Sequence, residues 1–221
     1  MTIAPAYVFD AYGTLFDVHS AAETHAEALG AGWTKLSEIW RTKQLEYTWV
    51  LASAGRHDSF YAVTERALDY AIAVTGVVVE DGLRRELMRG YRQLAAYPEV
   101  KGVLHDLKRA GARTLILSNG DLDMLGDAVC AAGLEDVLDD VLSVASVGIF
   151  KPSMSVYQLA VDATGLDAGD ISFQSSNRWD IAGAHVFGLQ TVWVNRFGRP
   201  DEYPDQPADQ TLADLRGLLP G

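Results

Sequence analysis

The order of apolar and polar positions divides the chain into three parts. A short apolar run, Tyr7–Phe9, is followed at once by Asp10 and a turn at Gly13, which is typical of a buried strand that ends on a carboxylate. From about residue 20 to residue 94, apolar residues recur at helical spacing and no strand is predicted. From Val100 onward, strand and helix patterns alternate, which indicates a parallel sheet with crossover helices.

The middle part predicts four helices, because each apolar stripe stops at a glycine or a proline. The expected ranges are 21–29, about 36–51, about 60–74 and about 81–94. Asp58 or Ser59 can cap the third helix, and Gly76 closes it. Pro98 ends the helical part, since proline disfavours helix in the residue before it.

The alternating part predicts four more strands, at about 114–117, 141–143, 171–173 and 191–194, and the last of them completes the sheet. The chain is therefore expected to be α/β: a Rossmann-like parallel sheet core of residues 1–16 and 98–221, with an inserted helical cap subdomain at 17–97. Polar clusters follow four strands, at Asp10, Ser118–Asn119, Lys151 and Ser175–Asp180. Ligands bind beyond the carboxyl ends of such strands, so we expect one site there, with the cap as its lid.

Composition and charge limit the classes of molecule that the protein is expected to bind. The 221 residues carry a net charge of −12, so neither nucleic acid nor an anionic membrane surface is expected as a partner. A small anion is compatible with this charge, since one local arginine outweighs distant charges in a closed pocket. No signal segment and no membrane span of about 20 apolar residues is found, which predicts a cytoplasmic protein. The single cysteine, Cys130, is expected to be a small buried apolar residue.

Asp10 and Lys151 are the natural pair at this edge. A lysine close to a carboxylate keeps the carboxylate ionised, and an ionised carboxylate can act as a nucleophile. A metal ligand and a buried structural ion pair are the alternative interpretations of the same residues. The serines and asparagines around them can be ordinary turn or cap residues, but their position at strand ends favours a function.

Five segments resemble the ordered motifs of the haloacid dehalogenase superfamily and, within it, of the (S)-2-haloacid dehalogenase family. They are Phe9–Leu15, Trp40–Tyr47, Leu117–Gly120, Phe150–Pro152 and Ser175–Asp180. The resemblance implies a hydrolase in which Asp10 displaces halide from a short (S)-2-haloalkanoic acid by SN2 attack. Water then hydrolyses the aspartyl ester and releases an (R)-2-hydroxy acid, without a metal ion or a cofactor.

The resemblance also implies which residues take part. Catalytic roles are implied for Asp10, Thr14, Lys151, Ser175, Asn177 and Asp180. The departing halide would be bound by Arg41 and Asn119. The substrate carboxylate would be bound by Ser118 and Tyr12. The pocket around the alkyl group would be formed by Leu45, Phe60, Tyr157 and Trp179.

The base that activates the hydrolytic water has two candidates. Asp180 is expected either to pair with Lys151 or to activate the water. His185 is the rival, because histidine is well matched to proton transfer near neutral pH. Five residues along a helix place His185 about 140° away from Asp180, which favours Asp180 as the base.

Two other functions stay open. A superfamily phosphatase would have an aspartate two positions after the nucleophile, where this chain has Tyr12, and a further acid pair where residues 175–177 are neutral. The remaining carboxylates, Asp10 and Asp180, are a poor ligand set for Mg²⁺. A non-catalytic binder of small carboxylates is the other alternative. A homodimer is expected by resemblance alone.

Overall fold

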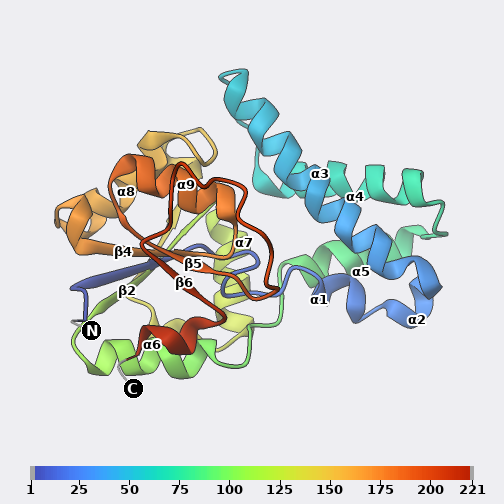
Figure 1. Ribbon diagram of the computed structural model, residues 1–221. Coiled ribbons are helices and arrows are strands. Elements are labelled where there is room, and N and C mark those ends of the chain that lie inside the picture. Colours follow the sequence, from blue (N-terminus) through green and yellow to red (C-terminus); the bar gives the residue numbers. More distant parts are fainter. Residues whose placement is uncertain (1–2, 220–221) are drawn as a thin grey trace.

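The computed structural model describes residues 3–219, which form a parallel sheet beside a layer of helices (Figure 1). Residues 1–2 and 220–221, which belong to the predicted core, lie outside the described part. The strands are β1 (Ala6–Phe9), β2 (Arg113–Ser118), β3 (Asp140–Ser143), β4 (Ile171–Ser175), β5 (Gln190–Val194) and β6 (Gln210–Leu212). They are parallel, in the order β3-β2-β1-β4-β5-β6. The predicted α/β class with a Rossmann-like core is confirmed.

Strand β1 lies in the middle of the sheet and sets the position of Asp10. All four of its residues are apolar and buried, as is usual for a parallel strand covered on both faces. Its register places Phe9 beside Ile116 of β2 and Gln174 of β4. The ladder continues one bond beyond β1, because the Asp10 N–H donates to the Gln174 carbonyl at 2.9 Å. Asp10 therefore leaves the sheet where β2 and β4 also end.

Four helices cover the two faces of the sheet. They are α6 (Val100–Arg109), α7 (Leu122–Ala131), α8 (Met154–Thr164) and α9 (Arg178–Phe187). Helices α8 and α9 lie on one face and α6 on the other (Figure 1), as right-handed crossovers in this strand order require. Because α8 and α9 both begin at the carboxyl-end edge of the sheet, they bring Lys151 and Asp180 to the side of Asp10.

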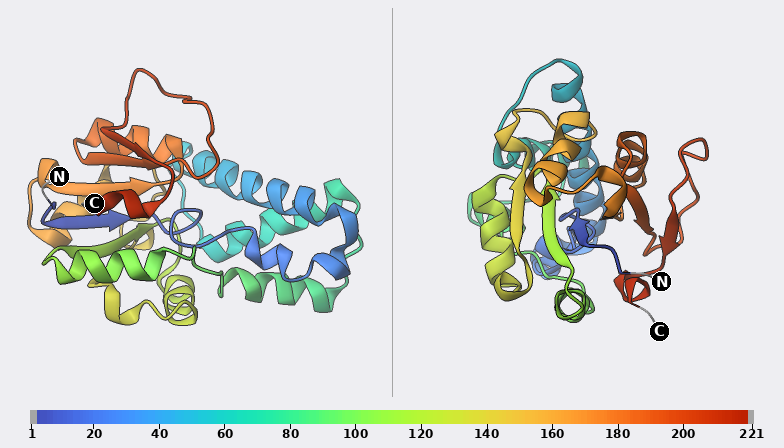
Figure 2. Two further views of the ribbon diagram at one scale, coloured as in Figure 1. Left: turned by 60° about the horizontal axis from the view of Figure 1, so that its bottom comes forward. Right: turned by 90° about the vertical axis from the view of Figure 1, so that its left-hand side faces the viewer.

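The remaining helices lie beyond the carboxyl-end edge of the sheet (Figure 1 and Figure 2). They are α1 (Ser20–Glu23), α2 (Ala26–Leu29), α3 (Trp33–Ser53), α4 (Phe60–Thr75) and α5 (Asp81–Tyr91). Helices α3 and α4 pack against each other. The two connections to the core run side by side, since Asp17 N–H donates to Ala95 O at 2.8 Å and Tyr97 N–H to Leu15 O at 3.0 Å. The cap bounds of 17–97 stay a prediction.

The ends of α4 confirm the predicted signals. Ser59 is the N-cap, and its hydroxyl accepts from the Ala62 N–H at 3.1 Å. Gly76 follows the helix in the left-handed region, with φ 68°. The single helix predicted over 21–29 is wrong, because α1 and α2 are separated at Thr24 and His25. His25 has non-helical angles (φ −110°, ψ 19°), and threonine and histidine are both weak helix formers.

Two further expectations are wrong. The sheet does not finish at residues 191–194, since β6 pairs with β5 at the edge; three half-buried or exposed residues give too short a pattern to detect. Cys130 is exposed on α7 rather than buried, because the buried stripe of that helix passes through Ala128 and Val129. Among residues 3–219, no helix combines the length and the apolar composition of a membrane span.

The contact between α8 and α9 generates a test of packing. A Cβ on Gly183 of α9 would lie 2.6 Å from the Tyr157 hydroxyl and 2.7 Å from Pro152 Cβ. We expect Gly183→Ala to lower the free energy of unfolding by about 1–3 kcal/mol, as overpacking does. Gly126→Ala on α7 is the matched control, because a Cβ there meets nothing within 4 Å, and it should stabilise by up to about 1 kcal/mol. Urea denaturation checks both; equal effects at the two positions would contradict the packing argument.

Candidate active site

Asp10 is buried and receives several hydrogen bonds. Lys151 Nζ donates to Oδ1 at 3.2 Å, and Asn177 Nδ2 donates to Oδ2 at 2.8 Å. The Thr14 hydroxyl donates to Oδ2 at 3.2 Å, and the Ser175 hydroxyl lies at the limit of hydrogen bonding, 3.5 Å. An ionised carboxylate only accepts, so this set of donors fits a charged Asp10. The predicted neighbours of Asp10 are brought together.

Lys151 lies between two carboxylates. Its ammonium is 3.2 Å from Asp10 and 2.9 Å from Asp180, and its side chain is 1% exposed. Burial by itself would lower the pKa of Lys151, but the charges of Asp10 and Asp180 outweigh it, and the pKa is raised. The lysine is therefore a fixed positive charge at the carboxyl-end edge.

Asp180 is fully buried on the far side of Lys151. Its Oδ1 accepts from the Tyr157 hydroxyl at 2.8 Å. Burial raises the pKa of Asp180, and the attraction of Lys151 offsets this only in part. Tyr157, predicted in the pocket wall, is fully buried behind Asp180, and burial raises its pKa well above the usual value. It supports Asp180 rather than forming the wall of a cavity.

The loop after β2 uses its polar side chains to hold its own shape. The Ser118 hydroxyl accepts from the Gly120 N–H at 3.1 Å, and Asn119 Oδ1 accepts from the Lys151 N–H at 2.9 Å. The second bond joins the β2 loop to the loop that carries Lys151. Because Oδ1 of Asn119 is directed at the Lys151 N–H, its Nδ2 donor is directed away from that N–H.

Arg41 reaches the core from helix α3. Its Nη2 donates to the Tyr12 carbonyl at 2.9 Å and to Asn177 Oδ1 at 3.4 Å, while Nη1 donates to Gln44 Oε1 at 2.8 Å. Gln44 is fully buried and also accepts from the Tyr91 hydroxyl at 2.7 Å. Gln44 was not among the residues predicted for the site. The signal was present, since a polar residue three positions after Arg41 lies on the same helical face.

Aromatic rings join the cap to the core next to Asp10. The Tyr12 ring lies 5.1 Å from the Phe60 ring and 5.6 Å from the Tyr91 ring. Its hydroxyl is buried, without a hydrogen-bond partner among the described residues, and burial raises the pKa of Tyr12 well above its usual value. Asp121 also holds the cap, because its carboxylate accepts from the N–H groups of Phe60 and Tyr61 at 3.0 and 2.8 Å. Asp121 was not among the residues predicted for the site.

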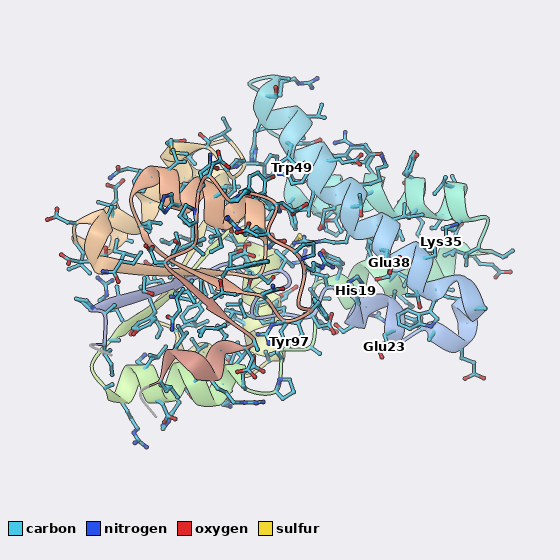
Figure 3. All side chains as sticks on the ribbon, viewed as in Figure 1. His19, Glu23, Lys35, Glu38, Trp49 and Tyr97 are labelled. Carbon is cyan, nitrogen blue, oxygen red and sulfur yellow. The ribbon has the colours of Figure 1, made fainter. Side chains whose placement is uncertain are left out.

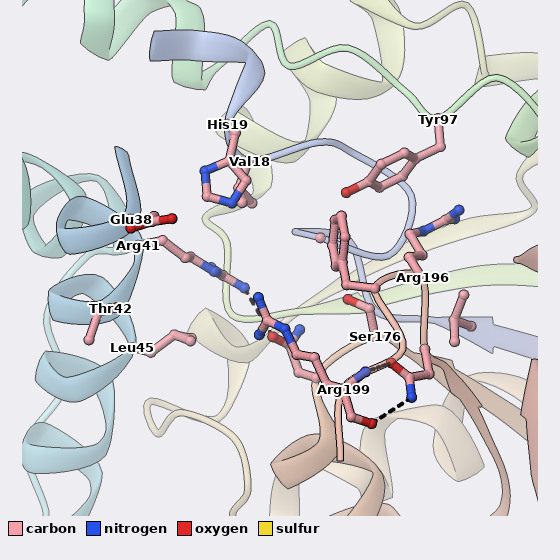
Figure 4. Close-up of a pocket in the computed structure, with 15 residues that line it drawn as sticks. Val18, His19, Glu38, Arg41, Thr42, Leu45, Tyr97, Ser176, Arg196 and Arg199 are labelled. Atoms are coloured by element: carbon pink, nitrogen blue, oxygen red, sulfur yellow. Dashed lines mark hydrogen bonds between the residues drawn. The ribbon is translucent and has the colours of Figure 1, made fainter. Parts of the chain in front are cut away.

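A cavity of about 400 Å³ opens beside this group, between cap and core (Figure 4). Its lining includes the predicted residues Arg41, Leu45 and Asn177. Among its other residues, His19, Glu38 and Tyr97 lie where the cap meets the core (Figure 3).

Two predicted residues lie elsewhere. Trp179, expected in the pocket wall, faces a second groove of about 510 Å³, where its ring lies 5.5 Å from Trp49 of α3. His185 is half-buried at the end of α9, and no hydrogen bond joins its ring to another described residue. Across residues 3–219, no group of three or more histidine, cysteine, aspartate or glutamate side chains is placed to hold a metal ion.

Comparison with known proteins reveals close relatives. The sequence model of the haloacid dehalogenase-like hydrolases matches residues 4–188. (S)-2-Haloacid dehalogenase 1 of Pseudomonas sp. (strain CBS-3) is 43% identical over 213 residues, 96% of this chain and 94% of the relative. A crystal structure of a dehalogenase aligns with a TM-score of 0.96 at 41% identity, covering 99% of this chain and 96% of the other. The L-2-haloacid dehalogenase of Xanthobacter autotrophicus with chloropropionic acid covalently bound aligns with a TM-score of 0.89 at 33% identity, covering 97% and 96%.

The position of Lys151 between two acids generates a prediction of pH-dependent stability. Lys151→Met leaves two buried carboxylates without their cation, so we expect a loss of about 3–5 kcal/mol in the free energy of unfolding at pH 8. A carboxyl whose folded pKa is raised contributes stability below its unfolded pKa and loses it as pH rises through the folded pKa. Because Asp180 already has a raised pKa, the loss should be smaller at pH 5.

Urea denaturation at both pH values measures this effect. Lys108→Met is the control, since the Lys108–Asp139 pair is 38% and 30% exposed, and its loss should stay below about 1 kcal/mol. An equal loss at pH 5 and pH 8 for Lys151→Met would contradict the proposed charge balance.

Proposed function

Because the chain belongs to the haloacid dehalogenase-like hydrolases and, among them, to the (S)-2-haloacid dehalogenase family, we propose that it hydrolyses short (S)-2-haloalkanoic acids. The products are the (R)-2-hydroxy acid and halide. The observation that carries this proposal is the environment of Asp10, a buried carboxylate that Lys151 and Asn177 hold in place beside the cationic Arg41. A nucleophile and a site for an anion are then adjacent.

In the first step a carboxylate oxygen of Asp10 attacks C2 of the haloacid. The new C–O bond forms as the carbon–halogen bond breaks, and the halide leaves with the bonding electron pair. Attack from the side opposite the halogen inverts C2, which gives the (R) product from an (S) substrate. Lys151 keeps Asp10 oriented, and Thr14, Ser175 and Asn177 limit its rotation.

Arg41 and Asn119 are proposed to stabilise the departing halide. The hydrogen-bond partners of Arg41 are all neutral: an amide oxygen of Gln44, the carbonyl of Tyr12 and the amide of Asn177. Its positive charge is therefore available to an anion that develops in the transition state. Asn119 has its oxygen bound to the Lys151 N–H, which leaves its Nδ2 as a donor. Ser118 and the Tyr12 hydroxyl are proposed to contact the substrate carboxylate.

In the second step water attacks the ester carbonyl of Asp10. One proton of the water passes to Asp180. The tetrahedral intermediate then collapses, the bond between the Asp10 carbonyl carbon and the ester oxygen breaks, and the leaving oxygen takes that proton from Asp180 as the hydroxy acid departs. The new Asp10 carboxyl loses its remaining proton to solvent, which restores the carboxylate. The raised pKa of Asp180 supports this role, since a carboxylate of higher pKa is a better base. Asp180 is also joined to Asp10 through Lys151, whereas His185 lies at the far end of α9.

We also propose that the reaction needs no metal ion and that the protein is a cytoplasmic homodimer. The Lys151 ammonium lies between the two carboxylates and supplies the positive charge at this point. Tyr12 stands where a superfamily phosphatase would have its general acid. The dimer rests on family resemblance, and the compartment on the single cysteine.

The function is tested by halide release. We expect the purified protein to release chloride from (S)-2-chloropropionate in the presence of EDTA, because no step uses a metal. Asp10→Asn should lower the rate at least about 10³-fold, while Asp140→Asn, which changes an exposed acid at the opposite edge of the sheet, should not. Ion chromatography measures the halide. No release from any haloacid, or Mg²⁺-dependent release of phosphate from phosphate esters, would overturn the proposal.

The base is tested by trapping the ester. We expect Asp180→Asn to form the Asp10 ester and then to stall, because the water keeps its proton, while His185→Ala turns over normally. Intact-protein mass spectrometry after brief mixing with (S)-2-chloropropionate detects the adduct. If His185→Ala accumulates the ester and Asp180→Asn does not, the two roles must be exchanged.

A further inference from the structure

The cavity between cap and core has an unusual charge for this protein. Three arginines line it, Arg41 from α3 and Arg196 and Arg199 from the loop after β5, together with one acid, Glu38. The whole chain carries a net charge of −12. A positive cavity in an acidic protein concentrates small anions at that point.

The three arginines differ in whether a carboxylate balances their positive charge. Arg196 pairs with buried Glu99 at 2.5 Å, and its guanidinium lies 3.8 Å from the Tyr97 ring centre. Arg41 has neutral partners. Arg199 is exposed, and no ion pair joins its side chain to another residue of the range 3–219. Two guanidinium groups therefore face the cavity without a carboxylate partner.

The backbone of Arg199 is held in place by hydrogen bonds. The Asn195 side chain accepts from the Arg199 N–H at 2.8 Å and donates to the Arg199 carbonyl at 2.9 Å, so one amide fixes both polar groups of that residue's backbone. The side chains of Arg199 and Arg41 point toward one another across the cavity, one from the core and one from the cap (Figure 4). Like charges facing each other repel, and an anion between them removes the repulsion.

His19 does not add to the positive charge of the cavity. It lines the same cavity, and its Nδ1 lies 2.8 Å from the Ser37 hydroxyl. Burial lowers the pKa of His19, and the charges of Arg41 and Arg199 lower it further against the opposing effect of Asp17. His19 is thus neutral at pH 7, and the positive charge of the cavity comes from its arginines.

We propose that Arg199 and Arg41 form an outer capture site for a small monocarboxylate. The planar guanidinium donors match the two oxygens of a carboxylate. Arg41 also contacts Asn177, which donates to Asp10, so a molecule held by the pair is one residue away from the nucleophile. If the proposed function is correct, the captured group is the carboxylate of the haloacid before it reaches Asp10.

Steady-state kinetics test the capture role. We expect Arg199→Gln to lower kcat/KM about 5- to 10-fold at low ionic strength and to leave kcat unchanged, because capture precedes chemistry. The difference should shrink as salt is raised above about 0.1 M. The kcat/KM of Arg199→Lys should lie between the values of the unchanged protein and of Arg199→Gln. The control Arg109→Gln makes the same charge change on α6, where the side chain is 73% exposed, and should have no effect. A loss of kcat, or an equal effect of Arg109→Gln, would overturn the proposal.

Binding to an inactive protein separates this proposal from the reaction. In the Asp10→Asn background, calorimetry with propionate should show several-fold weaker binding when Arg199→Gln is added. The carboxylate site would be overturned if Arg199→Gln left the affinity for propionate unchanged. It would also be overturned if this substitution weakened the binding of chloride but not that of propionate. If propionate binding depends on Arg199 but no haloacid releases halide, the capture site stands and the proposed function fails.

Discussion

The buried ammonium of Lys151 between Asp10 and Asp180 is the interaction on which the site depends. None of the three charged groups can be buried without the others, because burying an unpaired charge costs several kcal/mol of folding free energy. The three residues come from the end of β1, the loop before α8 and the start of α9. Their mutual requirement therefore fixes how the crossover helices meet the central strand. The group carries one excess negative charge, and the hydroxyl and amide donors around it offset that charge.

The cap supplies what the sheet edge lacks. The core provides the carboxylates and the lysine, whereas the cation with neutral partners, Arg41, comes from α3. Three kinds of contact hold the layers in register: the bond from Arg41 to the Tyr12 carbonyl, the packing of the Tyr12 ring against the Phe60 ring, and the Asp121 carboxylate at the N-terminus of α4. An acid at a helix N-terminus is favourable because the helix dipole is positive there. The same contact places Phe60 beside Tyr12.

The sequence predicted the core side of this arrangement better than the cap side. Asp10, Lys151 and Asp180 follow strands of a parallel sheet, whose carboxyl ends must meet at one edge, so their proximity follows from topology alone. Helical periodicity tells which face of α3 is apolar, but not which core residue that face meets. The link from Gln44 to Arg41 and the role of Asp121 are long-range contacts of this kind. The contact between Trp179 and Trp49 is of the same kind, since that side of α9 faces the end of α3.

The neutral partners of Arg41 would let an acidic protein bind an anion at this point. A carboxylate in place of Gln44 would hold the guanidinium equally well, but it would cancel the charge that the anion needs. An amide oxygen and a backbone carbonyl fix the orientation of Arg41 and leave its charge intact. Asp10, by contrast, has a cation as its partner, and a positive charge beside a carboxylate favours the ionised form that the proposed attack needs. Arg41, with neutral partners, keeps a charge that can attract an anion, whereas Asp10, with a charged partner, has its own charge balanced. Asn177 connects these two side chains.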